Sequence, residues 1–277
     1  MKKRTAPLLV LPLFLAAILA LQGCSYFNKG KEETVQQEPV EIMYNKAGRK
    51  LDAGEFLEAA KAFDAVEQNY PYSQWATRSQ LMAAYAHYKE LKYKDALEAL
   101  NRFIDLHPGD ENISYAYYLK ALCYYEQISD VRRDQKMTEL ALESLKQVKT
   151  RFPDSKYAKD AALKMDLTLD HLANKEMEIG RYYLVRKQYH AAINRFERVA
   201  EQYQTTSAVP EALHRLTESY ISLGMKAEAE KSAAILAENY PDSSWYKDTY
   251  RLFNPDALPR KASTYDRTIG KIKNIFN

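Results

Sequence analysis

The sequence predicts an all-α protein built as a solenoid of about five stacked helical hairpins. The chain of 277 residues has only eight glycines and ten prolines, so long stretches are compatible with helix and little resembles strand. Similar short endings recur along the chain, and apolar residues precede each ending at steps of three and four. These features are typical of a repeat protein in which each hairpin covers the apolar face of its neighbour.

The N-terminal segment, residues 1–23, predicts an export signal that ends before a cysteine. Three basic residues follow the first methionine, an apolar stretch runs from Leu8 to Leu21, and Gly23 precedes Cys24. The stretch is shorter than the roughly 18 to 20 residues that span a bilayer, although a simple transmembrane anchor stays open as an alternative. The pattern resembles a bacterial lipoprotein signal, which implies cleavage before Cys24 and its modification by N-palmitoyl and S-diacylglycerol groups.

The charge balance argues against a nucleic-acid partner. The chain has 40 lysines and arginines against 37 acids, a formal net charge of +3. Three of these basic residues and none of the acids lie in residues 1–23, so 37 of each remain after cleavage. The basic excess therefore belongs to the export signal and implies no phosphate-binding face. Residues 24–40 are polar with little apolar periodicity, which indicates a lipidated, flexible tether.

The repeats place a solenoid domain in residues 41–250. Four of its five hairpins end where an aromatic residue or a histidine stands directly before a proline, and the segment ending at Tyr203 keeps only the aromatic residue. Proline stops a helix, because it has no N–H to donate and disfavours helix at the residue before it. The expected hairpins are residues 41–70, 74–107, 111–152, 156–203 and 208–240.

An alanine recurs in the second helix of each hairpin, where a small side chain lets two helices approach closely. The intervals between these alanines are 37, 45, 51 and 37 residues, which predicts a long loop over 127–136 and a long helix from about residue 155 to 186. The pattern resembles the tetratricopeptide repeat, a helical pair of about 34 residues, and implies a right-handed α-solenoid. The alanines are Ala59, Ala96, Ala141, Ala192 and Ala229.

The C-terminal region predicts one more helix and then a basic tail. Residues 243–253 are expected to form an end cap that packs Trp245 and Tyr246 on the last hairpin. The tail, residues 251–277, has six basic residues against two acids, and its isoleucines together with Phe276 have amphipathic helical spacing. Two interpretations are open: a frayed tail, or a segment that docks on a protein or an anionic surface.

The sequence lacks the motifs of the common catalytic and metal sites. Its five histidines are scattered, without the paired spacings that bind zinc on a helix. Glycine-rich phosphate loops and the Gly-x-Ser-x-Gly motif are missing. The second cysteine, Cys123, lies in an apolar helical context and is expected to be buried. We therefore expect no catalytic residue, metal or cofactor, with an unrecognised enzyme as the open alternative.

Tyrosine is frequent, with 22 in the chain. Its large ring and polar hydroxyl suit surfaces that bind other proteins, and core packing is the alternative for many of them. One group lies in the third hairpin, and another is the pair Tyr182 and Tyr183. The spacing of Tyr115, Tyr118 and Leu122 predicts that these three residues mark the buried face of their helix.

Four features carry a more specific resemblance over roughly residues 24–242. The first is the cysteine before a short tether. The others are Tyr70-Pro71-Tyr72-Ser73; Asn101-Arg102-Phe103-Ile104-Asp105-Leu106 and Pro108 before Asn112-Ile113-Ser114-Tyr115-Ala116-Tyr117-Tyr118; and Asn194-Arg195 after Tyr182-Tyr183. In this order they resemble the BamD family, also called YfiO or ComL, of outer-membrane assembly lipoproteins.

The resemblance implies a non-enzymatic subunit of the machinery that inserts β-barrel proteins into the outer membrane. BamA and other lipoproteins of that machinery are the implied partners, and unfolded barrel proteins are the implied clients. Tyr70 becomes a candidate client contact, and Arg195 a candidate for client binding or coupling to BamA. Tyr182 and Tyr183 are further candidates. Packing within the repeat is the alternative for Tyr70, and pairing with a nearby acid is the alternative for Arg195.

The expected location is the periplasmic face of the outer membrane, through the lipid on Cys24. Lipoproteins retained at the inner membrane have aspartate after the cysteine in the family pattern, and this chain has Ser25. A second hypothesis stays open, in which the chain is a periplasmic tetratricopeptide scaffold lipoprotein that coordinates cell-wall enzymes.

Overall fold

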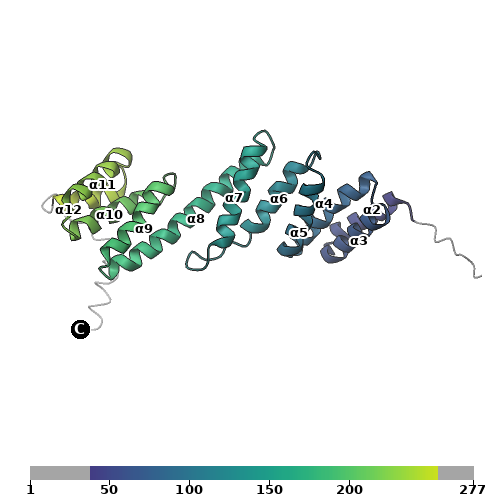
Figure 1. The fold of residues 1–277 in the computed structure, drawn as a ribbon, viewed down its shortest axis with the longest axis horizontal. Coiled ribbons are helices and arrows are strands. Elements are labelled where there is room, and N and C mark those ends of the chain that lie inside the picture. The colour runs from purple at the N-terminus through teal and green to yellow at the C-terminus, as the bar shows by residue number, and fades with distance from the viewer. Residues whose placement is uncertain (1–37, 255–277) are drawn as a thin grey trace, which may run out of the picture.

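The computed structural model describes residues 38–254, which form α-helices and no strand (Figure 1). The export signal, Cys24, most of the tether and the tail from residue 255 lie outside the described residues. The helices are α2 (Val40–Asp52), α3 (Phe56–Asn69), α4 (Gln74–Lys89), α5 (Tyr93–Leu106), α6 (Ile113–Tyr125), α7 (Lys136–Arg151), α8 (Ala158–Val185), α9 (Tyr189–Gln202), α10 (Val209–Ser222), α11 (Lys226–Asn239) and α12 (Ser244–Phe253).

The helices pair in sequence order, and the pairs follow one another along the long axis of the molecule (Figure 1). Each helix from α3 to α11 packs on the helix before it and the helix after it, and α12 packs on α10 and α11. The five expected hairpins thus correspond to α2–α3, α4–α5, α6–α7, α8–α9 and α10–α11. The prediction of an all-α solenoid is confirmed.

The second helix of every hairpin ends in the same way. At each end an aromatic residue or a histidine leaves the helix with φ between −123° and −136°, and its N–H donates to the carbonyl oxygen four residues earlier. Tyr203, which no proline follows, shares this geometry, so the C-cap residue adopts it with or without the proline. These C-cap residues are Tyr70, His107, Phe152, Tyr203 and Tyr240.

The core lies between the helices of successive hairpins and depends on small residues. All five recurring alanines have no exposed surface, which confirms the register of the repeats. The closest approach is between α8 and α9, where a Cβ added to Gly180 would overlap the ring of Phe196. Phe196 is itself fully buried, so the glycine makes room for the largest side chain of this interface.

Helix α8 has 28 residues and joins two parts of the core. Ala161, near its start, packs with residues of α6 and α7. Ala173 and Met177, in its second half, pack with residues of α9, α10 and α11. The long helix expected from about residue 155 to 186 is therefore present, and so is the long loop that precedes α7. Within residues 38–254, no helix combines the length and apolarity needed to cross a bilayer.

The buried face of α6 differs from the prediction. Ala116, Leu119 and Cys123 are almost fully buried, whereas Tyr115, Tyr118 and Leu122 are half-buried beside them. The cause is that α6 packs on both α5 and α7, so that the half-buried tyrosines lie at the border of the core. The predicted burial of Cys123 is confirmed, and burial raises the pKa of its thiol to about 12.

The end cap is present as predicted. Ser243 is the N-cap of α12, and its Oγ accepts a hydrogen bond of 3.1 Å from the backbone N–H of Trp245. Trp245 and Tyr246 are half-buried and pack against the core of the last two hairpins. Cap burial of this kind closes the apolar end that a terminal repeat would otherwise expose.

Candidate protein-binding surfaces

Five half-buried tyrosines form one surface, here called the tyrosine face, over the first helices of hairpins two, three and four. On α4, the ring centroids of Tyr85 and Tyr88 lie 6.5 Å apart. Tyr157, just before α8, lies 5.4 Å from Tyr115 and 5.0 Å from Tyr118, so it continues the row from α6. Aromatic contacts of this length hold the rings in fixed positions. The tyrosine face comprises Tyr85, Tyr88, Tyr115, Tyr118 and Tyr157.

Three hydroxyl groups of the tyrosine face are held in the protonated form. Burial, together with Glu126, raises the pKa of Tyr88 to about 12. Burial raises the pKa of Tyr115 and Tyr118, and the hydrogen bond from Tyr118 to Asp160, 2.5 Å long, adds to the effect. The surface therefore combines apolar rings with polar hydroxyl groups, of which that of Tyr118 already donates to Asp160.

Two exposed leucines extend this surface along α8. Leu163 and Leu167 have 59% and 58% of their surface exposed. They follow Asp160 and Lys164 by one turn each, and these two residues form an ion pair of 3.2 Å beside the tyrosine face. Residues three apart are neighbours on a helix, so the leucines lie next to that ion pair. Sequence reasoning missed these leucines, because an exposed leucine has the same helical spacing as a buried one.

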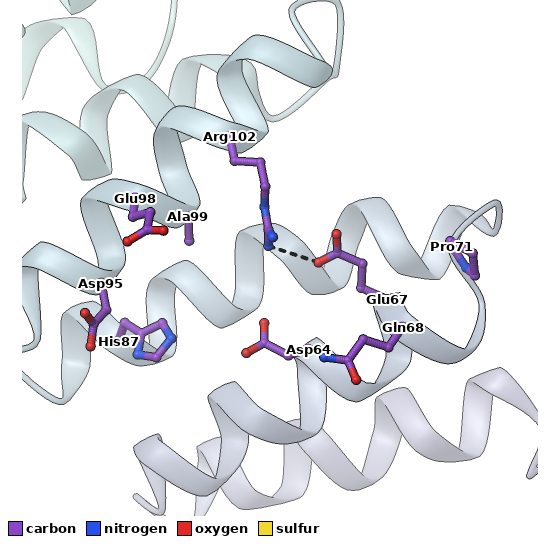
Figure 2. Close-up of a pocket in the computed structure, with 9 residues that line it drawn as sticks. All are labelled: Asp64, Glu67, Gln68, Pro71, His87, Asp95, Glu98, Ala99 and Arg102. Atoms are coloured by element: carbon purple, nitrogen blue, oxygen red, sulfur yellow. Dashed lines mark hydrogen bonds and ion pairs between the residues drawn. The ribbon is translucent and has the colours of Figure 1, made fainter.

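A second, acidic surface lies between α3 and α5 (Figure 2). It is a hollow of about 530 Å³ into which carboxylates project from both helices. Arg102 binds Glu67 across it at 3.1 Å, and Gln80 donates to the other oxygen of Glu67 at 2.8 Å. Burial raises the pKa of Asp64, although His87 and Arg102 act in the opposite direction. The other lining acids are Asp95 and Glu98.

Tyr70 lies at the end of α3 and is engaged within the chain. Its hydroxyl donates a hydrogen bond of 2.6 Å to the backbone carbonyl of Glu38, the first described residue. Its own carbonyl accepts from Ser73, which caps α4. Tyr70 therefore ties the start of the folded domain to the first hairpin. This contact fits the packing interpretation, and the client-binding interpretation stays a prediction.

Arg195 on α9 pairs with an acid, as its alternative interpretation expected. Its Nη1 lies 3.0 Å from one oxygen of Glu176 on α8, and Arg198 binds the other oxygen at 2.9 Å. The Glu176 side chain is only 12% exposed, whereas that of Arg195 is 32% exposed. Glu176 also lines a hollow of about 400 Å³ beside the loop before α7. The Arg195 guanidinium can thus reach a partner, while the carboxylate of Glu176 stays nearly buried.

Tyr182 and Tyr183 differ in exposure although they are adjacent. Their rings meet edge to face at 5.6 Å. Tyr183 is half-buried and packs against the C-terminal core, while Tyr182 is 52% exposed and carries the Arg186 guanidinium 3.7 Å above its ring. Val185, three residues after Tyr182, is 81% exposed. The end of α8 therefore presents a small aromatic and apolar surface.

The structure does not gather the predicted residues into one site. Tyr70 lies at the end of α3, in the first hairpin, whereas Tyr182, Tyr183 and Arg195 lie in the fourth (Figure 1). Among residues 38–254, no three side chains of histidine, cysteine, aspartate or glutamate converge so that they could hold a metal ion.

Comparison with known proteins identifies the family. The YfiO family, described as an outer membrane lipoprotein, matches residues 36–236. The chain is 47% identical over 249 residues to "Outer membrane protein assembly factor BamD" of Caulobacter vibrioides, covering 88% of this chain and 81% of that protein. It is 46% identical to the protein of that name in Rickettsia prowazekii, over 84% and 92% of the two chains. The chain therefore belongs to the YfiO family of outer membrane lipoproteins.

Proposed function

We propose that this chain is a non-enzymatic lipoprotein subunit of the machinery that assembles β-barrel proteins in the outer membrane. Its relatives are named outer membrane protein assembly factors, and the similarity extends over most of both chains. In this role the chain binds unfolded segments of barrel proteins and docks to BamA. The observation that carries the proposal is the tyrosine face with the exposed leucines of α8 beside it.

The tyrosine face suits an unfolded barrel segment on chemical grounds. A transmembrane β-strand alternates apolar and polar residues and leaves its backbone groups unpaired until it joins a sheet. Half-buried rings and the exposed Leu163 and Leu167 offer apolar contact, and the tyrosine hydroxyls other than that of Tyr118 offer polar contact to backbone groups. Binding is expected to be modest, because ordering an unfolded segment costs free energy. A client that must be passed on needs such an affinity.

The lipid on Cys24 would hold the solenoid beside the membrane. Several acyl chains anchor a protein stably, whereas one chain alone binds reversibly. As a flexible coil, the 14 residues from Cys24 to Gln37 would span about 19–22 Å on average. This length keeps the helices within reach of a membrane-bound partner and raises the effective concentration for docking.

Docking to BamA is assigned to the fourth and fifth hairpins. Arg195 offers a partly exposed guanidinium there, already oriented by Glu176. Tyr182 and Val185 add apolar surface nearby at the end of α8. Aromatic residues and arginine are the residue types enriched in the centres of protein interfaces. Client binding would then use the middle hairpins and the first half of α8, and partner docking would use the end of α8 and α9.

Site-specific photocrosslinking tests the client site. A photoreactive phenylalanine analogue replaces Leu163 in the full lipidated chain, and a C-terminal peptide of a barrel protein is added. We expect a crosslink that an excess of unlabelled peptide removes. The matched control carries the analogue at Tyr250, which is 47% exposed and lies on α12, beside α10 and α11 and outside the three hairpins of the tyrosine face. Equal crosslinking at the two positions, or none at Leu163, would overturn the assignment.

A further inference from the structure

A groove lies between α9 and α11 at the C-terminal end of the solenoid, with α10 as its floor. Its volume is about 680 Å³, a size at which pockets bury most of a bound ligand. The floor includes Leu213 and Leu216, which are almost fully buried. Ile235 of α11 stands at the side of the groove and is 40% exposed. Ile235 thus gives the groove an exposed apolar side chain.

The rim of this groove is acidic. Glu197 and Glu201 come from α9 and Glu228 comes from α11, while Lys231 is the one basic residue among those that line the groove. Glu197 is held in place by the hydroxyl of Tyr220, which donates to it at 2.6 Å. Three carboxylates against one ammonium group favour a cationic occupant with an apolar side.

The chain beyond residue 254 has this composition. Residues 255–277 contain five lysines and arginines against two aspartates. Ile269, Ile272 and Phe276 are spaced as i, i+3 and i+7, which places them on one face if the segment is helical. Lys273 would then flank that face, and Lys271 would lie towards the opposite side of the helix. A basic segment with one apolar face is complementary to an acidic rim beside the exposed Ile235.

The described chain also ends close enough for the tail to reach the groove. Helix α12 packs on α10 and α11, both of which line the groove, and the described residues end just after it at Asn254. The 15 residues from there to Ile269 can extend up to about 50 Å. Helix α10, with 14 residues, is about 21 Å long. The tether therefore exceeds the length of the groove.

We propose that the tail, residues 255–277, binds in the α9–α11 groove of its own chain. Its isoleucine face packs against the exposed Ile235, and its basic residues lie against the glutamates of the rim. The inference is independent of the proposed function, since it rests on the groove and the tail alone.

Intramolecular crosslinking tests this arrangement in the full lipidated chain, purified in detergent. Cysteines are introduced by Ile235→Cys in the groove and Ile272→Cys in the tail, and a short bismaleimide is added. Cys123 is buried and does not react. We expect a 235–272 crosslink by mass spectrometry whose yield does not depend on protein concentration. Glu201→Lys should lower the yield several-fold, and Lys271→Glu with Lys273→Glu should restore it.

The matched control is Ala234→Cys with Ile272→Cys. Ala234 is also exposed on α11, but it lines the hollow towards α12 instead of the groove. A yield several-fold below that of position 235 supports the proposal, provided circular dichroism shows equal helicity. Equal yields at 234 and 235 overturn it. A yield that rises with protein concentration also overturns it, because the crosslink then joins two copies of the chain. The proposal fails as well if the tail binds only anionic vesicles.

Discussion

Arg195 on α9 and Glu176 on α8 form an ion pair of 3.0 Å that links the two helices of the fourth hairpin. The carboxylate is nearly buried and also binds Arg198, so removal of one arginine leaves it with the other. The pair fixes the position of the Arg195 guanidinium without covering it. The ion pair thus links the two helices and also leaves the Arg195 guanidinium available to a partner.

The variant Arg195→Ala distinguishes the role of Arg195 in stability from its role in binding a partner. We expect a loss of at most about 1 kcal/mol in the free energy of unfolding, because Arg198 still neutralises Glu176. Recovery of BamA with the chain from detergent-solubilised membranes should fall several-fold. The matched control is Arg198→Ala, which removes the other half of the same pair and should leave that recovery unchanged. Equal effects of the two variants would make Arg195 purely structural.

Gly180→Ala tests the close approach of α8 and α9. The added methyl group would overlap the fully buried ring of Phe196, so we expect the free energy of unfolding to fall by about 1–3 kcal/mol. Gly48→Ala, in α2, is the control, because a methyl group there meets nothing within 4 Å. It should stabilise the chain by up to about 1 kcal/mol. Urea denaturation measures both, and a neutral Gly180→Ala would contradict the packing.

His214 predicts a loss of stability in mild acid. Its Nδ1 lies 2.8 Å from the hydroxyl of Thr249 on α12, and burial, helped by Arg215, lowers its pKa below 6.5. Glu218, Asp248 and Glu211 act in the opposite direction without reversing the shift. Below about pH 6.5 the unfolded chain takes up a proton that the folded chain resists, so the free energy of unfolding decreases as the pH falls.

The measurement is the urea midpoint at pH 7.5 and at pH 5, for the wild-type chain and for His214→Gln. The glutamine variant cannot titrate at this position, so its midpoint should fall less between the two values. The protection of the α12 amides against hydrogen exchange, relative to their intrinsic rates at each pH, should fall at pH 5 in the wild type, since His214 contacts both Thr249 and Trp245 of that helix. Parallel midpoints for the two chains would refute the role of His214.

Cys24→Ser tests the anchor. Without the cysteine there is no thiol for the diacylglycerol, so the chain should be soluble in the periplasmic extract or wrongly localised. Fractionation followed by immunoblotting measures the change. Helicity should stay as in the wild type, because the described helices begin at Val40. Unchanged attachment to the membrane would count against lipidation at this residue.

The helices and their register could be predicted from the sequence because each depends on local residues. An aromatic residue before a proline ends a helix whatever it packs against, and the five alanines mark the close contacts directly. The face of α6 could not be predicted in this way. Nearly every position of α6 (ISYAYYLKALCYY) is apolar or tyrosine, so its sequence has no polar face that would locate the buried one.

The surfaces were harder to predict than the helices. The acidic groove combines Glu201 of α9 with Glu228 of α11, and no pattern in the chain shows that these two residues share a rim. Tyr118 and Tyr157 are in contact at 5.0 Å although almost forty residues separate them. The sequence indicated that tyrosine was abundant in this part of the chain, but only the stacking of hairpins brings α6 and the start of α8 together.

Purification of the full lipidated chain from detergent-solubilised outer membranes tests the proposed role most directly. If the solenoid serves barrel assembly, BamA should be recovered as the main partner, together with unfolded barrel proteins trapped by crosslinking at Leu163. Recovery of cell-wall synthases without any barrel protein would contradict this role and would favour a periplasmic scaffold for cell-wall enzymes.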